Sequence, residues 1–460
     1  MSQPQTSRTR WLLVAWMVVI SGIAYLDRIN LSIAGPAIAR EYHLSNIHLG
    51  WVFSAFVVGY GLFQVPGGTL ADHWGARRVL TIGLLLWGVF TSLTAFVPPE
   101  VSGALFLLIG VRLLLGAGEA AVYPSCIRVI ANWIPTQDRG IVSGLILAGA
   151  GIGAAITPPL ITFIMVRYGW HWSFWASALI GVAAAVVWFL LARDAPERHP
   201  WVSSSELALI RAGVDVKPPQ APPGTPWRAI LWNKEIAATT MSCFCTGYVS
   251  YIFFTWFFVY LTTVRGLDLK AGSIDTMLPF IAMAICAPLG GSISDALTRR
   301  YGKRVGRCGI AVVCIAMAGV FVVVGARAAS PHVASIVLAG GVGAIYLAQS
   351  TFWSVIADVG GPWAGAATGV LNMGPQAGGV FTAILTPAIA NRYGWTASFL
   401  TAAALCGVGS LLWLFVDPDR KLIHDPRVVG ADGTWGSESS RKNYSPQEEQ
   451  QLNPERLPPN

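Results

Sequence analysis

The sequence predicts an all-α protein that crosses a membrane twelve times, with its helices arranged in two pseudo-symmetric six-helix bundles. Three observations predict this fold: the composition, the number of long apolar segments, and an internal repeat. Hydrophobic residues make up 54% of the 460-residue chain, and charged residues make up only 12%. Soluble domains carry roughly 25% charged residues, so this composition is typical of a chain that lies largely within a lipid bilayer.

Twelve apolar segments are each about as long as the roughly 20-residue helix that crosses a bilayer. In the first half, the expected spans are 11–39, 48–70, 79–97, 104–132, 140–166 and 172–193. In the second half, they are 234–262, 273–297, 306–326, 332–357, 363–390 and 395–416. The spans therefore define an N-terminal bundle, 11–193, and a C-terminal bundle, 234–416.

Arginine and lysine residues are concentrated in alternate loops between the expected spans. With helices of alternating direction, these loops lie on the same side as residues 1–10, and they hold Arg77, Arg78, Arg139, Arg299, Arg300, Lys303, Arg304 and Arg307. Cytoplasmic loops carry an excess of Lys and Arg, so we expect both termini in the cytoplasm of a bacterium and the spans in its inner membrane. This distribution accounts for the net charge of +8, and we expect no nucleic-acid partner.

The two halves of the chain resemble each other. The string Arg167-Tyr-Gly-Trp recurs as Arg392-Tyr-Gly-Trp, and Gly144 recurs as Gly369, both at an offset of 225. The string Gly67-Gly68…Asp72 recurs at an offset of 223 as Gly290-Gly291…Asp295. Two sets of markers at nearly one offset indicate a duplicated six-span unit. Repeats of this kind place a substrate near the bilayer midplane, between halves that rock around it.

Two segments lie outside the expected spans. Residues 194–233 are charged and proline-rich, and we interpret them as a hydrophilic cytoplasmic linker between the bundles. Residues 417–460 are polar, and we expect a cytoplasmic tail without a fixed structure. We assign no function to the tail.

The sequence offers no pattern that indicates a metal or another cofactor. The seven cysteines are an odd number and lie mostly within apolar segments, which argues against a disulfide framework. Cys243 and Cys245 are separated by a single residue, which is the wrong spacing for a metal-binding pair. We therefore expect no cofactor.

A carboxylate and a guanidinium, Asp27 and Arg28, lie near the middle of the first expected span. A charge at this depth costs on the order of 3 kcal/mol or more, so it normally faces a wet cavity and marks a transport pathway. The structural alternative is an ion pair that only fastens two helices. We favour the functional interpretation, because intramembrane ionisable residues are usually functional.

The fourth expected span carries a second pair of ionisable residues, Arg112 and Glu119. Seven residues make two helical turns, about 10 Å, so both side chains point to the same face. Glu119 lies in sequence among Leu, Gly and Ala, where burial favours the protonated acid, whereas the guanidinium beside Asp27 favours its carboxylate. We hypothesise that Glu119 is the principal proton-coupling residue and that Asp27 links proton occupancy to substrate binding.

Arg28 is the expected contact for a substrate carboxylate, because its fork of N–H donors matches the two carboxylate oxygens. Polar and aromatic side chains on five spans complete the candidate binding set: Tyr25, Tyr60, Gln64, Tyr248, Tyr251, Gln349, Ser350, Trp353, Asn372 and Gln376. Each has a structural alternative, since polar residues also bond helices together and tyrosines also mark membrane interfaces.

The loop between the second and third spans is a candidate gate. Its string runs from Gly68 through Asp72 and Gly75 to Arg77 and Arg78. Asp72 ends one helix and the arginines follow closely, so we expect ion pairs here that latch the cytoplasmic face. In the second half, Asp295 occupies the position equivalent to that of Asp72.

These strings resemble the major facilitator superfamily, whose loop between spans two and three has the Gly-x-x-x-Asp-x-x-Gly pattern followed by basic residues. Four further strings resemble its anion:cation symporter family, which includes bacterial galactonate, glucarate and hexuronate permeases. They are Tyr25-Leu-Asp-Arg28, Phe63-Gln-Val-Pro-Gly-Gly68, Arg112…Gly-Glu119-Ala…Tyr-Pro124, and Phe254-Thr-Trp256…Tyr-Leu261. The resemblance covers residues 11–416.

The resemblance implies the fold of that superfamily and a set of roles. It implies protonation at Asp27 and Glu119, substrate contact at Arg28 and coupling through Arg112. It also implies that Tyr25, Tyr60, Ser350, Trp353 and Asn372 line the site. The chain departs from galactonate-type members in span five, which has Ala148-Gly-Ala-Gly-Ile where they carry a glutamine. This departure leaves the identity of the sugar acid open.

We expect a monomeric, proton-coupled symporter that imports a small organic anion, with a sugar acid (hexuronate, aldonate or aldarate) as the first choice. An importer of a phthalate- or tartrate-type acid is an alternative, and so is an uncoupled uniporter or exporter. The spans show no His, Ser or metal-ligand cluster of the kind that a membrane enzyme needs. We therefore expect no enzymatic activity.

Overall fold

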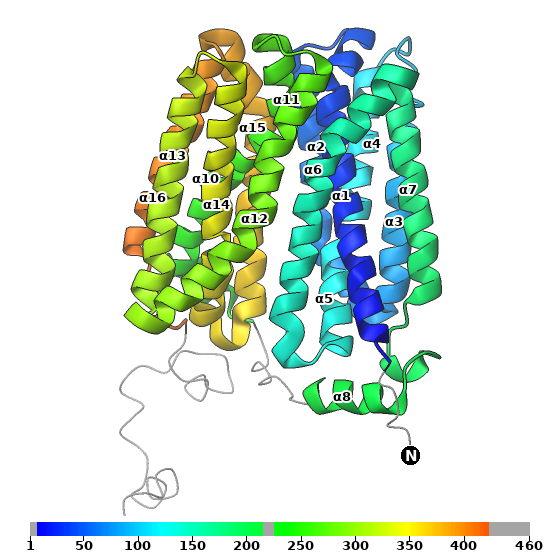
Figure 1. The fold of residues 1–460 in the computed structure, drawn as a ribbon, viewed down its shortest axis with the longest axis vertical. Helices are drawn as coiled ribbons and strands as arrows, with labels where there is room; N and C mark the ends of the chain where they lie inside the picture. The colour runs from blue at the N-terminus through cyan, green and yellow to red at the C-terminus, as the bar shows by residue number, and fades with distance from the viewer. Residues whose placement is uncertain (1–6, 215–224, 423–460) are drawn as a thin grey trace, which may run out of the picture.

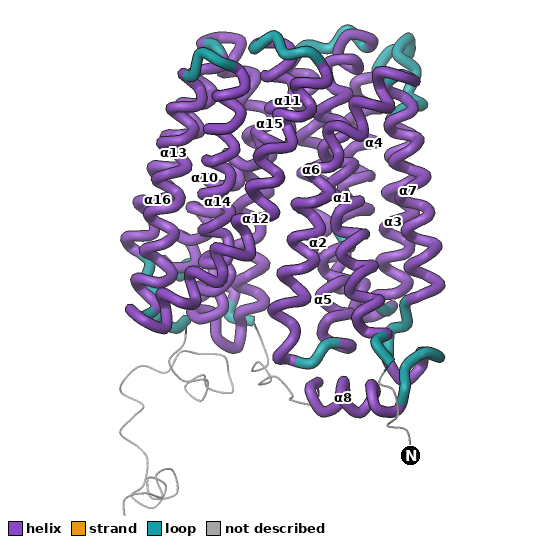
Figure 2. The backbone as a smooth tube through the Cα atoms, viewed as in Figure 1, coloured by secondary structure: helices purple, strands orange, loops and turns teal. Residues whose placement is uncertain are grey.

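The computed structural model describes residues 7–214 and 225–422 and is helical almost throughout them. Two bundles of long helices stand side by side (Figures 1 and 2). The first holds α1 (Thr9–Glu41), α2 (Asn46–Trp74), α3 (Ala76–Thr94), α4 (Ala104–Glu119), α5 (Val122–Trp133), α6 (Arg139–Tyr168) and α7 (Trp170–Leu191). The second holds α10 (Lys234–Thr255), α11 (Phe257–Val259), η3 (Tyr260–Val264), α12 (Leu269–Tyr301), η4 (Arg304–Gly309), α13 (Ile310–Arg327), α14 (Pro331–Gly360), α15 (Ala364–Tyr393) and α16 (Trp395–Leu412).

Eleven helical stretches of the described chain are long and apolar enough to cross a membrane. One of them, Pro331–Tyr393, has 63 residues and contains both α14 and α15, which the short turn η5 (Gly361–Trp363) separates. A hydrocarbon core of about 30 Å is crossed by about 20 helical residues, so this stretch crosses twice. The predicted all-α fold of twelve crossings in two bundles is confirmed.

Two of the predicted spans are interrupted helices. The predicted span 104–132 consists of α4 and α5, and the helix is broken at Ala120 and Ala121 between them. Pro124 explains the break, because it has no N–H to donate to the carbonyl of Ala120 and its ring crowds that carbonyl. The predicted span 234–262 likewise consists of α10, α11 and the π-helical turn η3.

The repeat that the sequence predicts is visible in the backbone. Gly169 joins α6 to α7 with a φ of +91°, and Gly394 joins α15 to α16 with a φ of +86°. Only glycine adopts such angles readily, so each chain reversal depends on it. Trp170 and Trp395 begin the next helix in the two halves. Equivalent residues therefore make the same turn in both bundles.

The predicted linker, 194–233, is partly folded. It contains α8 (Ser204–Val214), which lies beneath the first bundle, and the short α9 (Trp227–Leu231) (Figure 1). The Glu206 carboxylate accepts hydrogen bonds from the backbone N–H groups of Thr9, at 3.2 Å, and Arg10, at 3.1 Å. The first N–H groups of a helix have no partner within it, so Glu206 caps α1 from the linker. The tail beyond residue 422 lies outside the described residues.

The two bundles meet near the C-terminal end of α1. The hydroxyl of Ser32 donates a hydrogen bond to the backbone carbonyl of Thr255 on α10, at 2.7 Å. The ring of Phe53 on α2 packs edge-on against Trp256, with centroids 5.2 Å apart. A Cβ atom at Gly50 would lie 2.2 Å from the carbonyl oxygen of Ala383 on α15. Close packing therefore shuts this end of the interface.

The bundles diverge toward the opposite end. The last close approach of α2 to α15 that involves a glycine is at Gly61, where a Cβ atom would lie 3.5 Å from Gln376. One turn further along, Val65 lies on the same face of α2, yet 72% of its surface is exposed. Met373, one turn from Gln376, is 68% exposed. The facing surfaces of α2 and α15 are therefore no longer in contact here.

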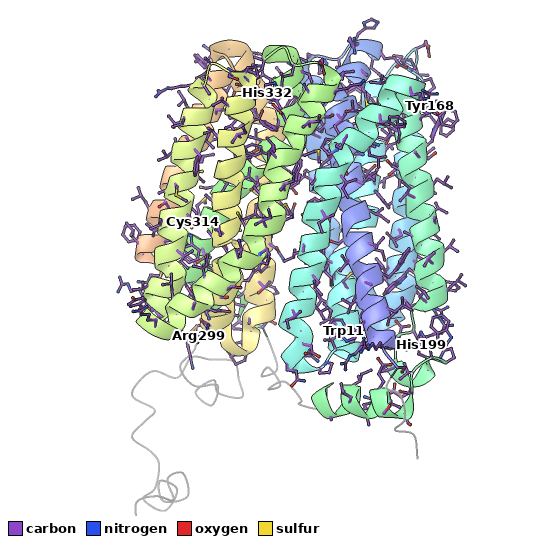
Figure 3. All side chains as sticks on the ribbon, viewed as in Figure 1. Trp11, Tyr168, His199, Arg299, Cys314 and His332 are labelled. Carbon is purple, nitrogen blue, oxygen red and sulfur yellow. The ribbon has the colours of Figure 1, made fainter. Side chains whose placement is uncertain are left out.

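The open end is the end at which the chain begins. Trp11, His199 and Arg299 lie together at the lower end of the bundles in Figure 3, whereas Tyr168 and His332 lie at the upper end. The arginine pair Arg299 and Arg300 is thus on the same side as the start of α1, in agreement with the alternation that the sequence predicts.

Candidate functional site

Two ion pairs join α1 to α4 at the centre of the first bundle. Arg28 holds Glu119, with its Nε donating a hydrogen bond to Oε1 at 2.7 Å and its Nη2 at 2.6 Å from the same oxygen. Arg112 holds Asp27, with Nη1 and Oδ2 separated by 3.2 Å. Two adjacent residues of α1 therefore contact two residues that lie two turns apart on α4.

These four side chains are buried. Asp27 is 0% exposed, Glu119 1% and Arg112 2%, and the Arg28 side chain retains 9%. The hydroxyl of Thr91 on α3 donates a second hydrogen bond to Asp27, at 3.1 Å to Oδ1. Removing one member of a buried ion pair typically costs about 3–5 kcal/mol, because the other charge is left uncompensated.

The ion-pair partners of the two acids are not their sequence neighbours. Asp27 adjoins Arg28 in sequence, but its partner is Arg112, and Glu119 is in contact with a guanidinium rather than only with apolar residues. Successive helical residues point about 100° apart, so Asp27 and Arg28 cannot pair with each other on one face. The structure brings these four residues together between α1 and α4.

Aromatic rings surround the guanidinium of Arg28. Its Cζ atom lies 4.4 Å from the ring centroid of Tyr60, 5.0 Å from that of Tyr25 and 5.3 Å from that of Phe56. Arg112 lies 5.2 Å from the same Phe56 ring. Such cation–π contacts stabilise a cation by roughly 0.5–2 kcal/mol each, so the rings help to hold both arginines away from bulk water.

A small cavity adjoins the ion pairs, between the two bundles. Its walls come from α1, α2, α4 and α10: Arg28, Phe53, Phe56, Val57, Arg112, Tyr251, Phe254 and Thr255. Its volume is about 20 Å³, which is enough for a single water molecule. Binding of any organic anion therefore requires these walls to move apart.

Part of the predicted C-terminal binding set reaches this cavity. Tyr251 on α10 lines it and donates a hydrogen bond to Gln376 on α15, at 2.8 Å. Phe254 packs against Tyr25, with ring centroids 5.5 Å apart. Tyr248 does not line the cavity, because its hydroxyl lies 3.4 Å from that of Thr386 and so bonds α10 to α15. For Tyr248 the structure therefore matches the alternative role, of bonding helices together.

The other predicted binding residues lie away from the ion pairs. Gln64, Gln349, Trp353 and Asn372 are partly exposed, and none of them lines the cavity. The Ser350 hydroxyl is buried and has no hydrogen-bond partner within residues 7–214 and 225–422. A Cβ atom at Gly291 on α12 would lie 3.7 Å from the Cβ of Ser350. The structure thus does not assemble these five residues with Arg28.

The candidate gating loop forms a different ion pair from the one expected. Asp72 lies 3.6 Å from Arg128 on α5, both being largely exposed, and Arg78 is also exposed. Arg77 donates its backbone N–H to Asp194, at 2.9 Å, and its side chain to the Phe189 carbonyl. In this conformation Asp72 is thus paired with α5, and the latch at the cytoplasmic face stays a prediction.

The glycines of the gating loop lie close to neighbouring elements. Gly75 has a φ of +87°, and a Cβ atom there would lie 2.5 Å from the Asp194 carboxylate, so only glycine fits. Gly68 approaches Pro124, with 3.5 Å between the Pro124 Cβ and an added Cβ. Asp295 is exposed at the equivalent place in the second bundle.

Sequence reasoning missed several residues of the site. Thr91 and Phe56 are single positions in apolar helices, and nothing in the sequence distinguishes them from core residues. Phe254 and Tyr123 stand in strings that carry the family resemblance, but the sequence analysis gave them no role. The Tyr123 hydroxyl lies 2.9 Å from that of Ser21 on α1.

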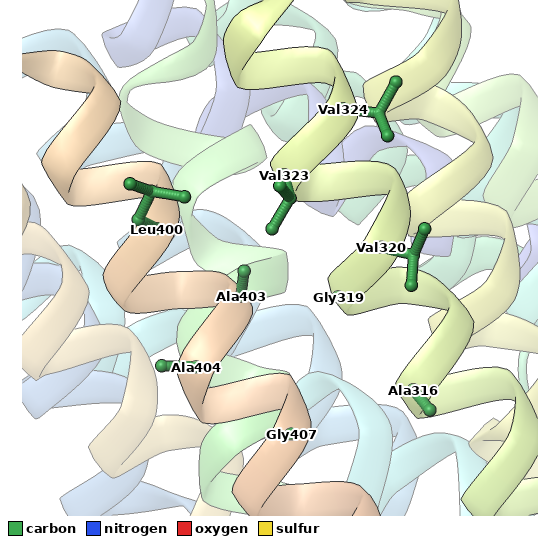
Figure 4. A pocket seen from close by; sticks show the side chains of 9 residues that line it. All are labelled: Ala316, Gly319, Val320, Val323, Val324, Leu400, Ala403, Ala404 and Gly407. Carbon is green, nitrogen blue, oxygen red and sulfur yellow. The ribbon is translucent and has the colours of Figure 1, made fainter.

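The described residues contain no group of three His, Cys, Asp or Glu side chains that could hold a metal ion. A separate hollow of about 460 Å³ lies between α13 and α16 (Figure 4). Its lining is wholly apolar and includes Gly319, Val320, Leu400 and Ala403, so it offers no group that could recognise an anion.

Known proteins resemble this chain over most of its length. Residues 17–379 match the family model of the Major Facilitator Superfamily. A probable sulfoacetate transporter of Cupriavidus necator is 32% identical over 416 residues, which cover 90% of this chain and 95% of the relative. The hexuronate transporter of Bacillus subtilis is 30% identical over 420 residues, which cover 90% and 96%. A probable galactarate/D-glucarate transporter of Escherichia coli is 31% identical over 314 residues, which cover 66% and 69%.

The fold also matches solved structures. A bacterial homologue of the human lysosomal transporter Spinster, in an inward-facing and occupied conformation, superposes with a TM-score of 0.70 at 14% sequence identity. The match covers 89% of this chain and 97% of that one. These relatives and the matching family are transporters, not enzymes.

Proposed function

This chain belongs to the Major Facilitator Superfamily, as its motifs indicated, and we propose that it is a proton-coupled symporter that imports a small organic anion, with a sugar acid as the first choice. The observation that carries the proposal is the pair of buried ion pairs, Arg28–Glu119 and Arg112–Asp27, beside a cavity between the two bundles. Intramembrane charges in such a position usually belong to a transport pathway.

The chemistry of the ion pairs supports coupling. Glu119 forms an ion pair with Arg28 only as a carboxylate, so a proton on Glu119 weakens the contact and makes the guanidinium available. Arg28 then has donors available for a substrate carboxylate at the cavity wall. Proton and anion thus favour the same state, which is the differential binding that coupling requires. Asp27 and Arg112 form a second pair of the same kind, which links α1 to α4 and α3.

The arrangement of the bundles supports alternating access. The interface is packed at the end with Ser32 and Thr255, and the facing surfaces separate at the end where the chain begins. With both termini in the cytoplasm of a bacterium, this conformation is open to the inside. Both bundles contribute to the cavity within one chain, so we propose a monomer as the transporting unit.

Roles for the flanking residues follow from this arrangement. Tyr25, Tyr60, Tyr251 and Gln376 would contact the anion beside Arg28 as the cavity opens. Gln64, Gln349, Ser350, Trp353 and Asn372 would line the route between the cavity and the open end. Asp72, paired with Arg128, and Asp295 would contribute to the gates at that end.

The names of the relatives support the class of substrate. They include transporters of hexuronate, of galactarate and glucarate, and of sulfoacetate, all of which are small organic anions. A sugar acid fits both these names and the residues that carry the family resemblance.

The test is uptake by the purified full-length chain in proteoliposomes under an imposed inward proton gradient. The panel contains glucuronate, gluconate, glucarate, tartrate and phthalate, each radiolabelled. We expect accumulation of at least one acid above its external concentration, and loss of that accumulation when a protonophore collapses the gradient. Uptake that is indifferent to the gradient would contradict proton coupling.

A further inference from the structure

We infer that the substrate is a small dianion whose two acidic groups are bound by Arg28 and Arg112 together. The inference rests on the proposed function, because it names the charge class of the anion that the same site would take. Among the acids considered above, it selects aldarates and dicarboxylates over hexuronates and aldonates.

Both guanidinium groups face one space. Arg28 and Arg112 are both in the wall of the cavity between the bundles. Their Cζ atoms lie 5.3 Å and 5.2 Å from the centroid of the same Phe56 ring. A small molecule beside this ring can therefore contact both cations, although Arg28 lies on α1 and Arg112 on α4.

The arginines are not saturated by their present partners. A guanidinium has five N–H donors. Arg112 holds Asp27 through Nη1 only, and its buried Nε has no hydrogen-bond partner within the described part of the chain. Oε2 of Glu119 is likewise buried and unpartnered there. Buried donors are normally satisfied, so the unused Nε of Arg112 is available to an acceptor that enters the cavity.

The charges of the site balance in pairs. Two carboxylates and two guanidinium groups give no net charge when the site is empty. Tyr25 and Tyr60, which lie against Arg28, and Tyr251, which lines the cavity, are neutral at neutral pH and add no charge. A dianion that enters with one proton for each carboxylate keeps the buried site neutral while it uses both arginines.

A monoanion would use the site only in part. It would need one proton and one arginine, and the second ion pair would stay closed. Burying a net charge at this depth is costly, so a monoanion that opened both pairs would have to carry an excess positive charge through the membrane. Two matched ion pairs that face one cavity therefore favour a substrate with two negative charges.

The first test compares acids of matched skeleton but different charge. Purified wild-type carrier in proteoliposomes is given radiolabelled glucarate or gluconate, phthalate or benzoate, and sulfoacetate or acetate under a fixed proton gradient. In every pair of which one acid is accumulated, we expect the initial rate of uptake of the dianion to exceed that of the monoanion by at least tenfold. An equal or faster rate for the monoanion would overturn the inference and leave proton-coupled anion import intact. No accumulation of any acid would overturn the proposed function itself, and the inference with it.

The second test measures charge movement. A potassium gradient with valinomycin sets the membrane potential while the proton gradient is held constant. A dianion with two protons moves no net charge, so initial uptake should change by less than twofold between 0 and −100 mV. Uptake that rises steeply at negative potential would contradict the inferred charge balance.

The third test uses the double variant Asp27→Asn with Arg112→Gln, which removes the second ion pair while keeping the first. We expect the preference for the dianion over the monoanion to fall to within about threefold of equality. Asp275→Asn is the matched control, because Asp275 is a buried carboxylate of α12 paired with His332 outside the site. If the double variant is properly folded by size-exclusion chromatography and keeps the wild-type preference, Arg112 does not bind the second acidic group. If the double variant does not fold, the first and second tests, which use the wild-type carrier, determine whether the inference holds.

Discussion

Arg28 donates a hydrogen bond to Glu119 at 2.7 Å at the residue where α4 ends, one turn before Pro124. The carboxylate that we propose to take the proton therefore stands at a break in its helix. Pro124 causes the break because it cannot bond to the carbonyl of Ala120. A local break lets the Glu119 segment shift when the ion pair opens, without distorting a continuous helix.

Replacement of Glu119 by Gln should abolish proton-driven accumulation of the substrate while leaving substrate exchange across the membrane intact. The amide can still accept a hydrogen bond from Arg28, but it cannot take up a proton. The weaker bond lowers the equilibrium constant for the contact with Arg28 by about tenfold. We expect substrate exchange across the membrane to continue in counterflow assays, while accumulation driven by a proton gradient falls to the level seen with a protonophore. Asp275→Asn should leave both activities near wild type. Full accumulation by Glu119→Gln would show that the proton is carried elsewhere.

Replacement of Asp27 by Asn should destabilise the protein through Arg112. The variant leaves a 2% exposed guanidinium without a counter-charge, and such a loss typically costs about 3–5 kcal/mol. Adding Arg112→Gln removes the uncompensated charge, so the double variant should recover most of the lost thermal stability in detergent. The double-mutant cycle measures this coupling. Equal melting temperatures for Asp27→Asn and the double variant would mean that the uncompensated charge of Arg112 does not lower the stability of the protein.

A side chain at Gly50 should weaken closure of the packed end of the interface. An added Cβ atom would lie 2.2 Å from the carbonyl oxygen of Ala383, a distance that real Cβ contacts do not reach, so α2 and α15 must separate. We expect Gly50→Ala to increase the labelling of a Ser32→Cys probe by a membrane-impermeant thiol reagent added from outside. Gly144→Ala is the control, because an added Cβ there meets nothing within 4 Å. Unchanged labelling would mean that this contact does not gate access.

The docking of the linker onto the first bundle should weaken in acid. His199 lies outside the spans, buried between Trp133 and Trp201, and burial lowers its pKa below the ordinary value of 6.5. A histidine with a lowered pKa in the docked state is neutral there, while the undocked state still binds a proton near pH 6.5. Docking is therefore fully stable above that pH and is lost as the pH falls through the lowered pKa.

Hydrogen exchange of α8 at several pH values measures this effect. Protection of α8 should decrease between about pH 6.5 and pH 5, and His199→Gln should flatten the dependence. Exchange of the Thr9 and Arg10 amides is the matched reference. These amides donate hydrogen bonds to Glu206 of α8, so their protection reports the same docking through a second contact. Protection of α8, corrected for the intrinsic exchange rate at each pH, that is greater at pH 5 than at pH 7 would have the wrong sign.

Much of the fold follows from the sequence because lipid imposes a simple rule: long apolar runs must be helices that satisfy their own backbone. The twelve crossings and the recurring Arg-Tyr-Gly-Trp turn at Gly169 and Gly394 were predictable for this reason. The helix break before Pro124 was not predicted, although the proline signals it. The capping of α1 by Glu206 could not be predicted, because residues 9 and 206 are brought together only by the tertiary fold.

The candidate site was likewise predictable only in part. That Asp27, Arg28, Arg112 and Glu119 are candidate functional residues followed from the cost of burying charge in a bilayer. Which carboxylate pairs with which guanidinium depends on helix rotation and offset, and the sequence does not contain these quantities. The contact of Asp72 with Arg128 was missed for the same reason, since α5 approaches the loop only in three dimensions.

The most direct test of the account is a measurement of proton movement that accompanies the anion. Proteoliposomes of the full-length chain, without any imposed gradient and with a pH indicator outside, receive an outside addition of the acid that the uptake panel identifies. Proton-coupled import by Glu119 and Asp27 predicts that the external medium becomes more alkaline as the acid enters, and that Glu119→Gln abolishes this change. Entry of the acid with no change in external pH would contradict the account.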